Sequence, residues 1–120
     1  MQLDQFYDFC FNLKGTTEHF PFDEDTLVFK VGGKIYALSS LSEWENETPK
    51  VNLKCDPEKS IELRETYSGI EPGYHMNKTH WNTVKINEDV PLVLLQELIQ
   101  HSHNLVFRSL SKKVQVEITN

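Results

Sequence analysis

The residues with the greatest capacity for chemistry lie together in one segment, 72–83, which opens with a Pro-Gly pair. The segment holds two histidines, one lysine, two asparagines, two threonines and two large aromatic residues. Such a stretch can present backbone N–H groups and a cation to an anion, and aromatic faces for stacking. Alternatively, Asn and Thr satisfy the backbone of a turn while Tyr74 and Trp81 anchor that turn to the core. Spacing alone favours this structural interpretation.

Catalysis and metal binding have less support in the sequence. No nucleophile, base and orienting group can be assembled from the spacing, so we predict a protein that is not an enzyme. His75 and His80 are five residues apart and His101 and His103 are two apart, but no cysteine or carboxylate completes a recognisable metal-ligand set. We therefore predict no metal site and no cofactor.

The length and the net charge of the chain exclude some further classes of protein. The 120 residues suit one domain, and a formal net charge of −6 argues against a broad electrostatic binder of nucleic acid or anionic membranes. Most of the net negative charge comes from segment 1–25, which leaves room for a local basic site elsewhere. No signal peptide or membrane span is visible, and the two cysteines suit a reducing compartment, so we expect a cytoplasmic protein with no membrane partner.

Periodicity predicts the elements that must position the 72–83 segment. Apolar residues at helical spacing predict a helix over 3–13 that ends near Gly15. Alternation predicts strands over 27–31 and 34–38, joined by the turn Gly32-Gly33, and another strand over 51–55. Segments 18–25 and 39–49 are expected to be a turn-like stretch and a polar loop.

The second half of the chain is expected to continue with helices. Asp56-Pro57 is a typical helix start, because Asp56 can cap the free N–H groups and Pro57 needs no donor. Segment 81–86 has β character, Pro91 opens a helix, and Ser102 is expected to cap a second short helix. Residues 114–118 alternate and suggest a terminal strand. The predicted fold class is α+β: two layers, with a mostly antiparallel sheet packed against helices.

Several blocks of the chain resemble the YjbR/MmcQ family, and the match covers most of the sequence. They are residues 54–58 (KCDPE), 63–67 (LRETY) and 72–84 (PGYHMNKTHWNTV), with the hairpin of 29–38 before them and 90–102 after them. The resemblance implies a CyaY-like, or frataxin-like, fold and a single domain over 1–120, in which 113–120 is a C-terminal extension. It also implies a DNA-binding role through a "double wing" arrangement of β-elements.

Two hypotheses about function follow from the residues and the resemblance together. In the first, lysines contact phosphates and an aromatic residue stacks on an unpaired base of DNA. In the second, the segment 72–83 binds a small anionic ligand or a protein. The candidate binding residues are Lys30, Lys34, Lys54, Tyr74, His75, Asn77, Lys78, His80, Trp81 and Asn82.

The frataxin-like fold suggests a third possibility, iron binding by an acidic surface. This possibility rests on fold analogy, which is a weak argument for function, and acidic runs are usually solvated surfaces. The residues concerned are Asp4, Asp8, Glu18, Asp23, Glu24 and Asp25.

Overall fold

The computed structural model describes residues 1–74 and 76–120 and contains one six-stranded antiparallel sheet in the order β1-β2-β3-β4-β6-β5. The α+β fold class is confirmed. The strands are β1 (Thr16–His19), β2 (Thr26–Val31), β3 (Lys34–Ser40), β4 (Lys50–Lys54), β5 (Ile70–Pro72) and β6 (Trp81–Lys85). The helices are α1 (Leu3–Phe11), α2 (Leu41–Glu45), α3 (Pro57–Thr66), α4 (Leu92–Ser109) and α5 (Lys112–Thr119).

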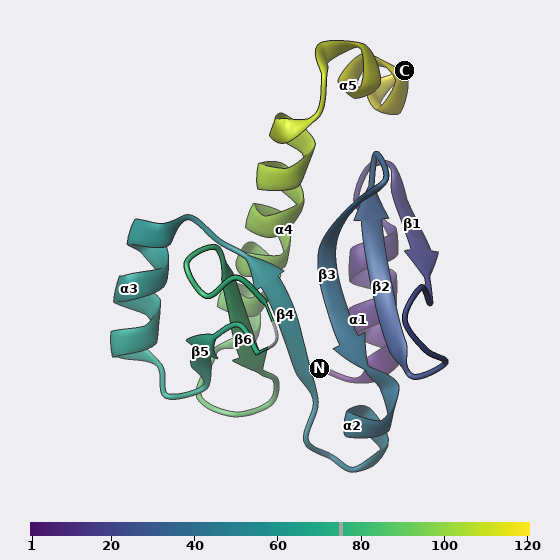
Figure 1. Cartoon of the computed structure of the whole chain (residues 1–120). Coiled ribbons are helices and arrows are strands. Elements are labelled where there is room, and N and C mark those ends of the chain that lie inside the picture. The colour runs from purple at the N-terminus through teal and green to yellow at the C-terminus, as the bar shows by residue number, and fades with distance from the viewer. Residues whose placement is uncertain (75) are drawn as a thin grey trace.

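Helices cover only one face of this sheet. Figure 1 shows α1 and α4 behind the strands, with α3 beside the β5–β6 edge. On β4, Val51 and Leu53 are buried against the helices, whereas Asn52 between them is half-buried on the other face. The alternation in the sequence therefore separates a packed face from an open face.

The sheet divides into two halves between β3 and β4. Only two residue pairs, Ala37 with Leu53 and Leu38 with Asn52, join these strands in the described residues, and Figure 1 shows the strands diverging toward the end near α3 and α5. Ser102 of α4 fills the junction: its hydroxyl donates to the Tyr36 carbonyl and accepts from the Lys54 N–H. One buried side chain thus satisfies backbone groups of both strands.

A β-bulge shapes the first half of the sheet. Phe29 pairs with Ala37 and Lys30 with Ile35, so Tyr36 is an extra residue and both Tyr36 and Ala37 are fully buried. The Tyr36 hydroxyl donates to the Cys10 carbonyl at 3.0 Å, which ties the bulge to α1.

Most predicted elements are present, and the turn chemistry agrees with the sequence. Gly32 and Gly33 have φ values of 57° and 81°, as the two-residue hairpin turn requires. Asp56 accepts from the Glu58 N–H at 2.9 Å and from the Lys59 N–H, which caps α3 behind Pro57.

Three predictions about the elements were wrong. The 39–49 loop contains helix α2, whose Trp44 stacks on Phe6 of the core. No separate helix begins at Ser102, because its hydroxyl bonds to the strands and α4 runs through it. The terminal strand is helix α5, and β1 and β5 were not foreseen.

Helix α5 forms because the alternating apolar residues also satisfy helical spacing. Val114 and Ile118 are four residues apart, lie on one face and pack against the core, whereas Val116 is 53% exposed. Ser111 caps the helix by accepting from the Val114 N–H. A Cβ at Gly15 would lie 2.6 Å from Ile118 Cγ2, so this glycine leaves space for α5 to dock.

Replacing both Val114 and Ile118 by alanine should lower the free energy of unfolding by about 1–2 kcal/mol, since apolar surface is lost from a half-buried contact. Urea denaturation measures the change. Val116→Ala is the matched control and should change stability by less than about 0.5 kcal/mol, because its side chain is exposed. Equal effects of the two variants would contradict the docking of α5.

Candidate functional site on the open face of the sheet

The open face carries a cleft of about 620 Å³. Its floor is the middle of β3, β4 and β6, and its rims are the β1–β2 loop with Phe22 on one side and the β5–β6 loop with Tyr74 on the other. The sheet order places these loops toward opposite edges of the sheet. A depression of this size can hold a small molecule or one unit of a polymer.

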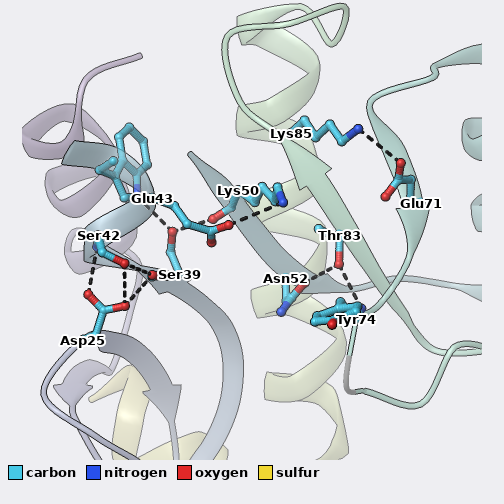
Figure 2. Close-up of polar contacts among 12 residues, drawn as sticks. Asp25, Ser39, Ser42, Glu43, Lys50, Asn52, Glu71, Tyr74, Thr83 and Lys85 are labelled. Atoms are coloured by element: carbon cyan, nitrogen blue, oxygen red, sulfur yellow. Dashed lines mark hydrogen bonds and ion pairs between the residues drawn. The ribbon is translucent and has the colours of Figure 1, made fainter. Parts of the chain in front are cut away.

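Two ion pairs stand along the cleft. Lys50 Nζ lies 3.4 Å from a Glu43 oxygen, and Lys85 Nζ lies 3.2 Å from a Glu71 oxygen, as Figure 2 shows. Because these pairs are partly exposed, each contributes at most about 1 kcal/mol to stability. Their main effect is to reduce the net charge along the cleft, since each lysine lies next to a carboxylate that neutralises it.

A chain of hydrogen bonds links the cleft floor to the β5–β6 loop. The Tyr74 N–H donates to Thr83 Oγ1 at 3.0 Å, and Thr83 Oγ1 donates to Asn52 Oδ1. Figure 2 shows the amide nitrogen of Asn52 pointing away from Thr83. Among the described residues, the two N–H groups of the Asn52 amide have no hydrogen-bond partner, so they can donate to a ligand in the cleft.

The 72–83 segment spans the end of β5, the loop to β6 and the start of β6, and much of its polarity stabilises its own turn. Asn77 Oδ1 accepts from the Thr79 N–H at 2.9 Å and from the His80 N–H at 3.3 Å. The Gly73 N–H donates to the Trp81 carbonyl, and a Cβ at Gly73 would lie 2.8 Å from Trp81 Cβ. His75 lies outside the described residues. For Asn77 the structural interpretation is thus the better one.

The guanidinium of Arg64, on α3, forms hydrogen bonds to the β5–β6 loop and the start of β6. Its Nε donates to Asn82 Oδ1 at 2.8 Å, and its Nη2 donates to the carbonyls of Lys78 and Trp81 at 2.6 and 3.3 Å. Asn82 is buried on the packed face and also donates to Ser60 Oγ. Asn82 cannot reach an external ligand without giving up these bonds, so its predicted binding role is not supported by its position.

The predicted lysines fall into three places. Lys30 and Lys54 lie on the open face, because each sits between strand residues buried on the packed face. Lys54 pairs directly with Trp81 across β4 and β6. Lys34 pairs with the buried Val31, so the register directs it to the packed face at the end of the hairpin.

The remaining loop residues, Lys78 and His80, have exposed side chains but backbone groups held in internal hydrogen bonds. The His80 carbonyl accepts from the Cys55 N–H at 2.8 Å. The structure therefore places Lys30, Lys54 and Trp81 on the same face of the sheet, with Lys54 and Trp81 paired and Lys30 two strands from Lys54. Tyr74 lies on the cleft rim, and Lys34 lies on the other face.

The acidic segment forms no metal centre among the described residues: no group of three His, Cys, Asp or Glu side chains is arranged to hold an ion. Several of its carboxylates accept hydrogen bonds from the protein instead; Glu18, for example, accepts from the Tyr7 hydroxyl. Asp23 accepts from the Thr26 N–H at 2.6 Å, and Asp25 accepts from Ser40 and Ser42 at the start of α2.

The family model for YjbR matches residues 11–105. The chain belongs to the YjbR family. Protein YbdF of Escherichia coli O157:H7 is 45% identical over 98 residues, which are 82% of this chain and 78% of YbdF. Protein YjbR of Escherichia coli K12 is 29% identical over 103 residues, covering 86% of this chain and 85% of that protein.

The YjbR-family fold is also seen in a solved structure. A crystal structure of a Deinococcus radiodurans protein superposes with a TM-score of 0.91 at 39% identity, and covers 98% of this chain and 88% of that one. None of these three names states an activity, so membership establishes the fold and leaves the function to the chemistry of the site. Among the described residues, no helix is long and apolar enough to cross a bilayer.

Sequence reasoning named Tyr74 but missed the other residues that form the cleft. Asn52 could have been found, since it occupies a polar position of the predicted strand 51–55, and Lys50 continues that alternation by one residue before it. Phe22 and Glu71 gave no such signal. They reach the cleft because the sheet order brings their distant segments to its rims.

Arg64→Ala should lower the free energy of unfolding by about 2 kcal/mol, because Asn82 Oδ1 and the Lys78 carbonyl then lose their Arg64 donor and the Trp81 carbonyl keeps only the Gly73 N–H. Chemical denaturation measures the loss. Lys59→Ala removes an exposed cation from the same helix and serves as the control, with an expected change below about 0.5 kcal/mol. An Arg64→Ala protein as stable as the control would show that the loop does not depend on this residue.

Acid should destabilise the cleft rim through Asp25. Hydrogen bonds from the Ser40 hydroxyl and the Ser42 N–H lower the pKa of Asp25 in the folded chain. Its pKa returns to about 3.9 on unfolding, so this stabilisation is complete above that pH and is lost as the pH falls through the lower folded value.

Melting temperatures measured between about pH 5 and pH 2 test this role of Asp25. As the pH is lowered, the melting temperature of Asp25→Asn should fall less than that of the original chain. Glu24→Gln replaces the neighbouring exposed carboxylate and is the control. Its melting temperature should fall with pH as much as that of the original chain. The same decrease in Asp25→Asn and in the original chain would contradict the role of this carboxylate.

Proposed function

We propose that this protein is a non-enzymatic DNA-binding protein that uses the open face of its sheet. The observation that carries the proposal is the placement of Lys30, Lys54 and Trp81 on one uncovered face, with Lys54 and Trp81 directly paired across two strands. Lysine ammonium groups supply phosphate contacts, and an aromatic ring beside them can stack on a base.

The distribution of charge supports this assignment despite the net charge of −6. Figure 1 places the β2–β3 turn and α5 at one end of the molecule, and the β1–β2 connection and α2 at the other. Lys34 follows the turn, and Lys112 and Lys113 open α5. The acidic runs 23–25 and 43–47 lie in or beside the β1–β2 connection and α2. A chain that is acidic in total therefore has a basic end toward which a phosphate backbone is attracted.

The alternative of a small anion held by the backbone of the 72–83 loop has less support. An anion cradle needs free N–H groups, but those of Gly73, Tyr74, Thr79, His80 and Trp81 already have partners within the protein.

We also propose a cytoplasmic location. The two cysteines are consistent with this location and with a binding protein that has no cysteine nucleophile. Cys10 and Cys55 are free and buried, and burial raises the pKa of both thiols. A protonated, buried thiol is a poor nucleophile, and unpaired cysteines suit a reducing compartment.

Binding to fluorescently labelled single-stranded and duplex DNA, followed by anisotropy, tests the proposal. Lys54→Glu should weaken binding about tenfold at low salt and reduce the slope of log affinity against log salt by about 1, since a phosphate contact is lost. Lys14→Glu changes the net charge equally but lies in the turn between α1 and β1, where the Lys14 carbonyl contacts His103 of α4, and not on the open face, so it should have a smaller effect. The absence of binding to both forms of DNA at low salt would refute the proposal.

A further inference from the structure

We propose that the cleft on the open face receives one unstacked base of a single-stranded nucleic acid, while the adjoining phosphate lies at Lys54. This inference rests on the proposed DNA-binding function and assigns the form of nucleic acid and the part of it that is recognised. Four features of the described residues support it: the aromatic rims, the neutral charge, the free amide donors of the floor and the spacing along β4.

The rims offer aromatic faces to a flat ligand. Phe22 is 65% exposed and Tyr74 is 70% exposed, and they line the cleft from the β1–β2 loop and the β5–β6 loop. Large apolar side chains left so exposed beside a depression mark a contact surface. A nucleobase suits it, because every base has two flat faces that stack on aromatic rings.

The charge of the cleft suits a base and not a phosphate. Lys50 is paired with Glu43 within the cleft, and Glu71 is paired with Lys85 beside it, so each charged side chain that lines the cleft has a partner of opposite charge. A neutral base edge, which carries donors and acceptors side by side, can bond to such walls. A phosphate would have to approach two carboxylates, so it lies more favourably at Lys54.

The floor provides a directional contact. Asn52 Oδ1 is used by the Thr83 hydroxyl, and its amide nitrogen points away from Thr83 (Figure 2). An amide N–H pair can donate to the ring nitrogens and carbonyl oxygens of a base. Because Thr83 fixes the oxygen, the orientation of these donors is set before a ligand arrives.

The spacing along β4 connects the cleft to the phosphate site. Asn52 and Lys54 project from the same face two residues apart, which is about 7 Å along a strand. The distance between a base and the phosphate of the same nucleotide is similar to this spacing of Asn52 and Lys54. One nucleotide can therefore contact both side chains, with its base over Asn52 and its phosphate toward the basic end.

A base inside a duplex is stacked and paired, so it cannot enter the cleft without being unstacked at a cost in free energy. The proposal therefore includes a preference for single strands. Deoxyribose and ribose polymers share this chemistry, and comparing DNA and RNA of equal sequence distinguishes which of the two is bound more tightly.

The decisive experiment compares a labelled single strand of about 12 nucleotides with an abasic strand of the same length, which keeps the sugars and phosphates. We expect the abasic strand to bind at least tenfold more weakly to the full chain. Equal binding of both strands would overturn the base site while leaving nucleic-acid binding intact. No binding of either strand would overturn the proposed function, and this inference with it.

Two rim variants locate the effect in the cleft. Phe22→Ala and Tyr74→Ala should each weaken binding of the normal strand about tenfold and leave binding of the abasic strand unchanged. Phe11→Ala is the matched control, since Phe11 is 47% exposed on α1 in the helical layer, and should change neither. If the rim variants bind the normal strand as the original chain does, the base does not lie in the cleft.

A floor variant separates hydrogen bonding from stacking. Asn52→Asp keeps an oxygen for Thr83 but replaces the N–H donors with an acceptor, so the normal strand should lose affinity. The added negative charge acts on both strands, and the abasic strand measures that contribution alone. If Asn52→Asp lowers the affinity for the normal strand no more than the affinity for the abasic strand, Asn52 does not donate to a base. Thermal melting of each variant confirms that the protein is folded.

Discussion

The architecture depends on how α4 holds two diverging strands together. Ser102 is completely buried, and its hydroxyl donates to the Tyr36 carbonyl of β3 and accepts from the Lys54 N–H of β4. These backbone groups would otherwise lack partners in a buried position, because only two residue pairs join β3 to β4. The helical layer therefore sets the relation of the two halves of the sheet, and with it the shape of the opposite, open face.

A second constraint is that one face of the sheet is packed and the other is not. Strand side chains alternate between faces, so burial of Val51 and Leu53 obliges Asn52 and Lys54 to occupy the open side. The same rule aligns Lys54 with Trp81 and Asn52 with Thr83 through the register of β4 and β6. Binding chemistry on this face is thus a consequence of the packing behind it.

The net charge of −6 and a nucleic-acid partner are compatible because charge is distributed unevenly. Acidic side chains gather around the β1–β2 connection and α2, whereas lysines occur at the opposite end of the molecule. Between these regions, the lysines of the cleft are neutralised by Glu43 and Glu71. In the proposed function, such a gradient orients a polyanion along the face and keeps its phosphates away from the acidic end.

What the sequence by itself determined was local. Gly32-Gly33, the Asp56-Pro57 cap and the alternation of β4 follow from the conformational limits and hydrogen bonding of neighbouring residues, so they could be predicted. The resemblance to the YjbR family also identified the family and the fold. The terminal segment was assigned wrongly because Val114, Val116 and Ile118 satisfy both strand and helix periods. The contact of Ile118 with Gly15, more than a hundred residues away, is consistent with the helix only.

Only the tertiary structure decided which polar residues are free to bind. In sequence, Asn77 and Asn82 look as suitable as Asn52, but Asn77 caps its own turn and Asn82 is bonded to Arg64. Phe22 and Tyr74 are likewise unrelated in sequence and become the two rims of one cleft through the strand order. The physical reason is that a hydrogen-bonding group has a limited number of partners, and long-range packing determines whether those partners are inside the protein or in solution.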